Sequence, residues 1–249
     1  NPEDYTNRGR IVTPLKDRIG SVIRTHYPRT IEESIRITSE NAWIHRNDGV
    51  QVVIPRFMSE IVEEFIRLAR TSPHVNQQSG VSVRASITCT ETMVSNAERR
   101  GILLKEAHVM PRVSDLANIA ASIRGKIELM LAEDEQAEDK LIAALLGEAV
   151  KNIAARYFEI DQLEPIVEQF AGSKTNIEIG DDIRADAIVQ SASGIKGLTR
   201  LATAVCKAAE LSPEDPAALA SAIEFVLEAG YVNNRLSKYA YRGSTFYKR

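Results

Sequence analysis

The segment RFMSEIVEEFIRLAR, residues 56–70, repeats apolar side chains at the spacing that marks one face of an α-helix. These apolar positions are Met58, Ile61, Val62, Phe65, Leu68 and Ala69. Charged side chains occupy much of the other face, at Arg56, Glu60, Glu63, Glu64, Arg67 and Arg70. The pattern predicts a helix with one buried face and one face in water. Because similar patterns recur through the chain, a mainly α fold is expected.

Upstream of this segment, the sequence predicts one strand and one further helix. SVIRTHYP, residues 21–28, is short, rich in β-branched side chains and closed by Pro28, which predicts a strand. TIEESIRITSENAW, residues 30–43, begins with Thr30 and has Glu33 three residues later. That spacing is a capping box, in which the side chains of both residues bond to backbone N–H groups at a helix start. VQVVIP, residues 50–55, is expected to be extended.

Downstream, helical spacing predicts most of the remaining elements. Helices are expected over 81–101, ending at Gly101; over 110–131, with Ser114 as N-cap; and over 140–158. Three more are expected from about Gln162, over 194–209 and over 213–229, the last with Ser212 as N-cap and Pro213 at the first helical position. The polar segment 172–186 is ambiguous, and TNIEI (175–179) is a candidate short strand.

Composition limits the class of protein. The 249 residues carry a net charge of −3 and 44% hydrophobic side chains, which suits a globular chain. No run of 18 uncharged apolar residues occurs, so no membrane span is expected. The charge is not basic, which argues against a general nucleic-acid partner. The only cysteines are Cys89 and Cys206, and with no secretory leader pattern at the start they favour a reducing, cytoplasmic location.

The acidic run AEDEQAED, residues 132–139, suggests a boundary between two parts of the chain. A lone strand at 21–28 cannot satisfy its own backbone groups. We therefore expect its sheet partners to lie upstream, outside these 249 residues, which would also account for a first residue other than methionine.

A complete catalytic site is absent from the sequence. The four histidines show no metal-ligand spacing, so no metal site is expected, and neither a Gly-x-Ser-x-Gly elbow nor a Gly-x4-Gly-Lys-Ser/Thr phosphate loop occurs. Arg84, in SGVSVRAS, is unusual because it falls in the first turn of a predicted helix, where the helix dipole favours anions. It is either an ordinary surface arginine or a residue that shares an anion such as phosphate with the helix end.

Three short motifs follow one another: Asn1-Pro2, then Leu15-Lys16-Asp17-Arg18, then Gly80-Val81-Ser82-Val83-Arg84. In this order they resemble the second half of the AAA+ ATPase core of the magnesium-chelatase and MoxR-like clade. The stretches MPRVSDL, GKIEL and EFVLEAG strengthen the similarity to magnesium-chelatase-like ATPases. The three-motif match covers roughly residues 1–130, and similarity over 131–249 is softer.

The resemblance implies an architecture. Residues 1–29 would be the C-terminal edge of an AAA+ α/β core, 30–131 a helical lid, and 132–249 an all-helical C-terminal extension. It also implies a ring-forming homo-oligomer that uses ATP and Mg²⁺ in the full-length protein to remodel a protein client or insert a metal. The Walker A lysine and Walker B acids are missing from these residues, so the fragment alone should bind no cofactor and hydrolyse no ATP.

The same resemblance implies three site residues. Asn1 would be the sensor-1 residue that positions the attacking water, and Arg18 the arginine finger that reaches a neighbouring subunit's nucleotide. Arg84 would be the sensor-2 arginine, which couples the lid to the γ-phosphate. Ile19 departs from the phenylalanine that many relatives have after Asp-Arg, and Arg8 and Arg10 are alternative fingers in the same loop.

Two geometric expectations follow. Arg18 should be accessible to solvent, and Arg84 should lie near a helix start and face an open groove. The rival function is a non-enzymatic helical protein-interaction module with vestigial AAA+ features. The basic C-terminal stretch, 231–249, is expected to be a solvated or docked tail, with an anionic protein or nucleic acid as the alternative partner.

Overall fold

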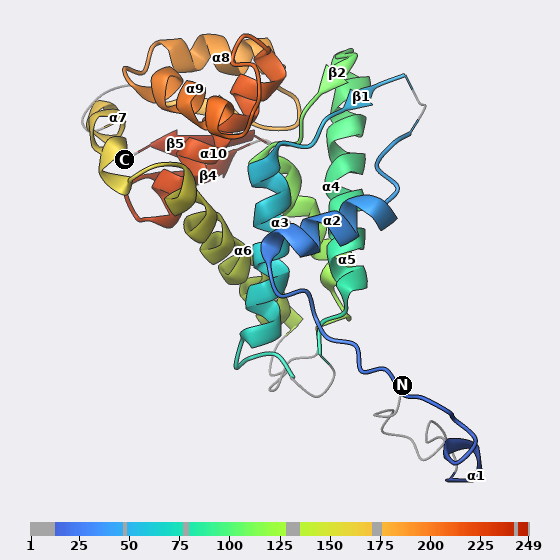
Figure 1. Cartoon of the computed structure of the whole chain (residues 1–249). Coiled ribbons are helices and arrows are strands. Elements are labelled where there is room, and N and C mark those ends of the chain that lie inside the picture. The colour runs from blue at the N-terminus through green and yellow to red at the C-terminus, as the bar shows by residue number, and fades with distance from the viewer. Residues whose placement is uncertain are drawn as a thin grey trace.

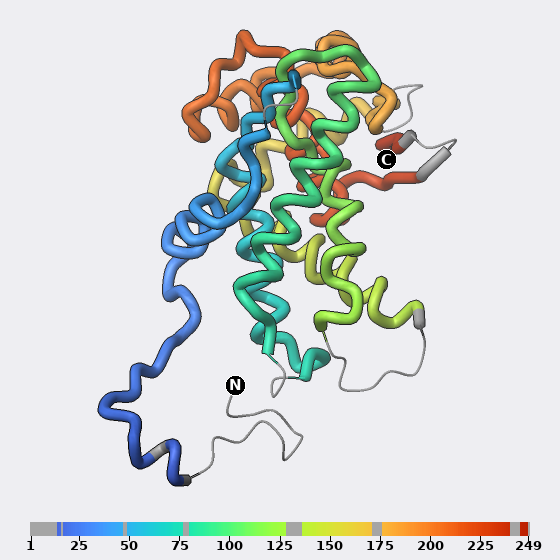
Figure 2. Tube along the Cα trace, turned by 90° about the vertical axis from the view of Figure 1, so that its right-hand side faces the viewer, coloured from blue at the N-terminus to red at the C-terminus, as the bar shows by residue number. Residues whose placement is uncertain are grey.

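The structure, a computed structural model, describes residues 13–46, 49–76, 80–127, 135–170, 176–241 and 244–248. Helices form most of this part of the chain, as predicted, and short strands are few (Figure 1). None of the described helices is long and apolar enough to cross a lipid bilayer. An N-terminal arm, residues 13–29, runs away from the helical body, and the C-terminal strands β4 (Ser237–Tyr241) and β5 (Ser244–Lys248) lie on the body far from the arm (Figure 2).

The arm corrects the first strand prediction. It contains one short helix, α1 (Thr13–Lys16), and residues 21–28 form neither helix nor strand. Val22 is 78% exposed and Ile23 is 87% exposed. A strand needs a neighbour to bond its backbone, and none of the described residues pairs with this segment. The β-branched composition therefore predicted a strand that has no partner here.

Helix α2 (Ile31–Asn41) begins at the predicted capping box. The backbone N–H of Glu33 donates to Thr30 Oγ1 at 3.1 Å, and the backbone N–H of Thr30 donates to Glu33 Oε2 at 3.4 Å. Together these bonds satisfy backbone donors that a helix start would otherwise leave unpaired. This local prediction is confirmed.

Helix α3 (Arg56–Thr71) matches its predicted span, but the three glutamates of its charged face are not in water. Glu60, Glu63 and Glu64 are each 4% exposed. The reason is that α3 packs against α2, α4 (Val83–Leu104) and α6 (Glu135–Tyr157), so that helices cover it on several sides. Tyr157 of α6, for example, donates to Glu60 Oε2 at 2.8 Å.

Helix α4 extends beyond its predicted end. It continues to Leu104, and Lys105 closes it in the left-handed conformation with φ 57°. Gly101 serves close packing instead of capping: a Cβ there would lie 2.9 Å from side-chain atoms of both Val50 and Val109. Next to it, β1 (Gln51–Val52), which lies in the segment predicted as extended, pairs in parallel with β2 (His108–Val109).

The helix predicted over 110–131 forms only in part. Its first half is a 3-10 helix, η1 (Val113–Ile119), followed by the single turn α5 (Ala120–Ile123). Ser114 is not the N-cap, because η1 starts before it and its own backbone N–H donates to Glu224 Oε2 at 3.0 Å. A distant carboxylate therefore replaces the local cap.

The C-terminal half contains α6, η2 (Ile160–Leu163), α7 (Glu164–Phe170), α8 (Ala185–Ser193), α9 (Leu198–Ala208) and α10 (Pro216–Val232). All but α8 and η2 correspond to predicted helices; α8 starts inside the polar segment that looked ambiguous. Helix α10 begins three residues later than predicted: Asp215 Oδ1 accepts from the backbone N–H of Ala217 at 2.9 Å, and Pro216 is the first helical residue. It is buried over nearly its whole length.

The basic C-terminal stretch folds back as a hairpin. Strands β4 (Ser237–Tyr241) and β5 (Ser244–Lys248) pair antiparallel, and β5 also pairs with β3 (Ile177–Ile179), which falls within the candidate strand TNIEI. Tyr247 is 1% exposed, and Arg235 Nη1 lies 3.5 Å from Glu164 Oε2. The stretch is therefore docked on the body. Its strands also correct the expectation of an all-helical extension over 132–249, because β3, β4 and β5 form a three-stranded sheet there.

One cluster of buried apolar side chains runs from Ile31 to Tyr247. Near its centre the rings of Phe57 and Phe225 stack with centroids 4.8 Å apart, and Tyr157 meets each of them edge-on. Aromatic contacts thus join α3, α6 and α10. The division at 131/132 stays a prediction, because a shared core fits one domain as well as two closely packed ones.

Candidate functional site

The turn before α4 is held from both sides. Ser82 is the N-cap of α4, and its Oγ accepts from the backbone N–H of Arg84 at 3.2 Å. Gly80 has φ +63°, in the left-handed region that favours glycine. The carbonyl of Val81 accepts from Arg70 Nε at 3.0 Å. The Gly80–Arg84 motif is therefore a defined turn that leads into a 22-residue helix.

Arg84 occupies the second position of α4, and its side chain is exposed. Its guanidinium forms no hydrogen bond or ion pair with any described residue, and the first turn of α4 contains no acidic side chain. The helix dipole places partial positive charge at the same end. Two sources of positive charge therefore meet there, and none of the described residues supplies a bonded counter-charge. The expected position near a helix start is confirmed, and the open groove stays a prediction.

Tyr27 joins the arm to this turn. The guanidinium carbon of Arg70 lies 4.2 Å from the centroid of the Tyr27 ring, a cation–π contact. The same Arg70 bonds to Val81, so one side chain links the arm, α3 and the turn. Burial lowers the pKa of Arg70, and the nearby Tyr27 and Glu63 act in the opposite direction.

Arg18 lies in the arm and is exposed, as expected for a residue that acts on a neighbour. Its backbone N–H donates to the carbonyl of Leu15 at 3.1 Å, just after α1. Its guanidinium has no bonding partner within the described ranges, and no contact joins it to Arg84. Asn1 lies outside the described residues, as do Arg8 and Arg10, so their roles stay predictions.

The carboxyl group of Glu63 forms hydrogen bonds that connect α2 and α3 to the first turns of α4. Its Oε1 accepts from Thr38 Oγ1 at 2.5 Å and its Oε2 from Ser86 Oγ at 2.9 Å. One carboxyl group thus ties α2 and α3 to a residue two positions after Arg84. Burial raises the pKa of Glu63, while the two hydroxyl donors and Arg70 oppose the shift. The sequence predicts that Glu63 faces solvent, because it falls on the charged face of the predicted helix, and the spacing along one helix does not show which other helices cover that face.

A second group of charges lies near the other end of α4. We define the buried charge cluster as Arg100, Glu106, Arg112, Asp115 and Glu224, each at most 8% exposed at its side chain. Asp115 Oδ2 accepts from Arg100 Nη2 at 3.0 Å and from the backbone N–H of Arg112 at 2.7 Å. Arg112 Nη1 donates to the carbonyl of Ile183 at 2.9 Å. The cluster therefore connects α4, η1, the segment before α8, and α10.

The buried charge cluster is not fully bonded. The cluster atoms that are buried without a hydrogen-bond partner are Arg100 Nε, Glu106 Oε2, Arg112 Nη2 and Glu224 Oε1, and the neighbouring Ser114 Oγ also has none. An unpaired buried polar group costs about 1–3 kcal/mol. Burial raises the pKa of Glu224, with Arg112 and the backbone N–H of Ser114 acting against that shift. No sequence pattern indicates this cluster, because its members come together only through the fold.

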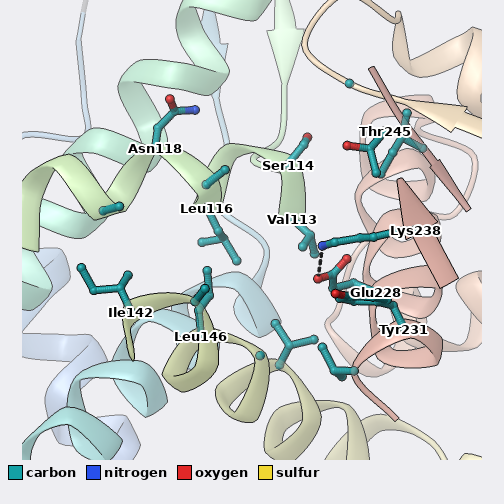
Figure 3. A pocket seen from close by; sticks show the side chains of 18 of the residues that line it. Val113, Ser114, Leu116, Asn118, Ile142, Leu146, Glu228, Tyr231, Lys238 and Thr245 are labelled. Carbon is teal, nitrogen blue, oxygen red and sulfur yellow. Dashed lines mark hydrogen bonds and ion pairs between the residues drawn. The ribbon is translucent and has the colours of Figure 1, made fainter. Parts of the chain in front are cut away.

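A cavity of about 610 Å³ lies beside the cluster, between η1, α6, the end of α10 and the three-stranded sheet. Leu116, Ile142 and Leu146 form an apolar side, and Ser114, Thr245 and Lys238 lie on the other (Figure 3). Lys238 Nζ donates to Glu228 Oε1 at 2.6 Å. The cavity is the second candidate site of the described chain.

Nucleophilic and metal chemistry receive no support from the described residues. Burial raises the pKa of Cys89 to about 12 and that of Cys206 to about 11, so both are neutral thiols at pH 7. Within the described ranges, no group of three or more His, Cys, Asp or Glu side chains is placed to hold a metal ion.

No family model, curated protein or solved structure matches this chain.

Proposed function

We propose that this chain is the C-terminal part of a ring-forming AAA+ ATPase of the magnesium-chelatase-like type. The observation that carries the proposal is Arg84: an exposed guanidinium without a described partner, at the start of α4, within Gly80-Val81-Ser82-Val83-Arg84. An anion such as the γ-phosphate of ATP would receive both the guanidinium and the positive end of the helix. Arg84 would then couple the position of the helical lid to the nucleotide.

The charge placement suits phosphoryl transfer. This reaction needs little covalent help from the protein and depends on positioning and on neutralising charge at the phosphate oxygens. A guanidinium presents planar N–H donors that match those oxygens. In this proposal Arg84 acts on the nucleotide of its own subunit, and Asn1 positions the attacking water.

The arm supports an intersubunit role for Arg18. Leu15 is 52% exposed and Ile19 is 42% exposed, and Val22 and Ile23 are more exposed still. Apolar side chains gathered on one segment mark a surface that other polypeptide covers. Arg18 lies among them and is itself exposed, which suits a finger that completes a neighbouring subunit's site.

The nucleotide needs more than these residues. Because the 249 residues contain no phosphate-binding loop, another segment of the full-length polypeptide has to hold the triphosphate and its Mg²⁺. The described acids form no metal-binding group, so no step through Mg²⁺ is assigned to them. We further propose a cytoplasmic location, supported by two buried free thiols, and a protein client that the C-terminal half contacts.

Single substitutions in the full-length protein test this function. Arg18→Ala should lower the rate of ATP hydrolysis about 10³-fold or more while nucleotide affinity persists, because a finger acts mainly on the transition state. Arg84→Ala should weaken both affinity and turnover. Arg24→Ala, which removes another exposed arginine of the same arm, is the matched control and should behave as wild type.

A mixing experiment separates action in trans from misfolding. Arg18→Ala subunits retain their own nucleotide site, so mixing them with subunits whose phosphate-binding loop is disabled should restore part of the activity. Normal turnover in both arginine variants would sink the assignment. A full-length reading frame without a phosphate-binding loop would favour the non-enzymatic interaction module.

A further inference from the structure

The cavity beside the buried charge cluster has the size of a small-molecule site. Its volume, about 610 Å³, falls in the range of roughly 300–1,000 Å³ that ligand pockets occupy. Its walls come from elements on both sides of residue 132, and neither Arg18 nor Arg84 lines it. An inference about this cavity is therefore independent of the proposed ATPase function.

The polar side of the cavity contains donors that the protein leaves unused. The hydroxyl of Thr245 has no hydrogen bond to any described residue. In Figure 3 the hydroxyl oxygen of Thr245 and the ammonium of Lys238 lie on the side opposite Leu116 and Ile142. A ligand's polar group would find its partners at this end.

The charges around the cavity are already balanced. Glu228 accepts from Lys238 Nζ through one oxygen and from the hydroxyl of Tyr247 through the other. At the opposite rim, Arg124 and Asp139 form two hydrogen bonds of 2.7 and 2.9 Å. A charged ligand would lose its hydration and gain no unpaired counter-charge in return. A neutral polar group avoids that cost.

We propose that this cavity binds a small uncharged molecule with an apolar body and a carbonyl or hydroxyl head group. The body lies against Leu116, Ile142 and Leu146, and the head accepts hydrogen bonds from the hydroxyl of Thr245 and a spare N–H of Lys238. Because η1 and α6 form facing walls, a bound molecule also bridges the two halves of the chain.

Three probes that share one chain length test the head group: heptanamide, heptanoate and heptylamine. Each is titrated into the purified 249-residue chain and its Kd is measured by saturation-transfer NMR. Heptanamide should bind with a Kd on the order of 1 mM, as expected for a ligand of this size. The two charged probes should bind at least about fivefold more weakly, because each has to lose its hydration without a counter-charge.

A matched pair of variants locates the binding. Ala143 and Ala144 are both exposed on α6, but only Ala143 lines the cavity. Ala143→Trp should weaken heptanamide binding about tenfold or more by filling the cavity, and Ala144→Trp should leave it unchanged. Thr245→Val should weaken it about threefold to tenfold without loss of fold, because the hydroxyl lines the cavity and forms no hydrogen bond to a described residue in the free protein.

Circular dichroism first confirms that each variant is folded. The proposal is overturned if heptanamide shows no binding at about ten times the expected Kd. Equal affinity for the three probes, or equal effects of the two tryptophan variants, would overturn it as well. Each outcome is independent of whether the full-length protein hydrolyses ATP.

Discussion

Arg112 and Glu224 face each other inside the protein, with Nη1 3.7 Å from Oε1 and side chains that are 1% and 0% exposed. Arg112 lies just before η1 and Glu224 in the middle of α10. Their contact is part of the buried charge cluster that joins the two halves of the chain.

Arg112→Met should lower the free energy of unfolding by about 3–5 kcal/mol, because it leaves buried carboxylates without their counter-charge. The double variant Arg112→Met, Glu224→Leu should recover part of the loss by removing one of those carboxylates. Urea unfolding measures both. Arg124→Met, which breaks an exposed ion pair with Asp139, is the control and should change little. If Arg112→Met and Arg124→Met are equally stable, the cluster is not a structural anchor.

Glu63 should make stability fall as pH rises. Burial raises its pKa in the folded state, so between the unfolded and folded pKa values the folded protein binds more protons. The stability that Glu63 contributes is complete below the unfolded pKa and is lost as pH rises through the folded pKa. Glu63→Gln should therefore flatten that part of the curve, measured by urea unfolding between about pH 4 and pH 8.

A second substitution at the same site checks the cause. Ser86→Ala removes one donor to the Glu63 carboxylate, which should raise its pKa further and steepen the loss of stability. Ser39→Ala, on the exposed side of α2, is the control. A wild-type slope in both Glu63→Gln and Ser86→Ala would show that another group causes the pH dependence.

Gly80→Ala should destabilise the turn before α4 by about 1 kcal/mol or more, because Gly80 has φ +63° and L-residues resist that conformation. The added Cβ would also lie 2.8 Å from Tyr27 Oη, which should loosen the Tyr27–Arg70 contact. Thermal unfolding and limited proteolysis of the arm measure these effects. Gly20→Ala is the control, since its Cβ would meet nothing within 4 Å. Identical proteolysis of the two variants would contradict the turn's role in holding the arm.

Phe225→Ala should cost about 3–5 kcal/mol, the usual loss for a buried phenylalanine, and should test the division at 131/132. Phe225 stacks on Phe57 of α3, so if the chain unfolds as one unit, hydrogen exchange should accelerate in α3 as well as in α10. Phe246→Ala, in the half-buried hairpin ring pair with Tyr239, should have a smaller and more local effect. Loss of hydrogen-exchange protection in α10 alone would support two separate domains.

Local chemistry explains which elements the sequence predicts. The capping box of Thr30 and Glu33 acts within four residues, and the spacing of α3, α4, α6 and α10 follows from helical geometry alone. The motif Gly80–Arg84 likewise places Arg84 at a helix start, because Ser82 caps the next turn. For these features the neighbouring residues supply all the partners that matter.

The fold decides the rest, because the partners come from distant parts of the chain. Val22 and Ile23 have strand-like composition, but a strand also needs a neighbouring strand, and none is available to them in the described chain. Glu63 has a polar side chain, yet α2 and α4 cover it and supply hydroxyl donors. The sequence by itself determined a mainly helical chain and an arginine at the start of α4. Only the tertiary structure determined the buried charge cluster and the cavity, since burial and charge pairing depend on which helices meet.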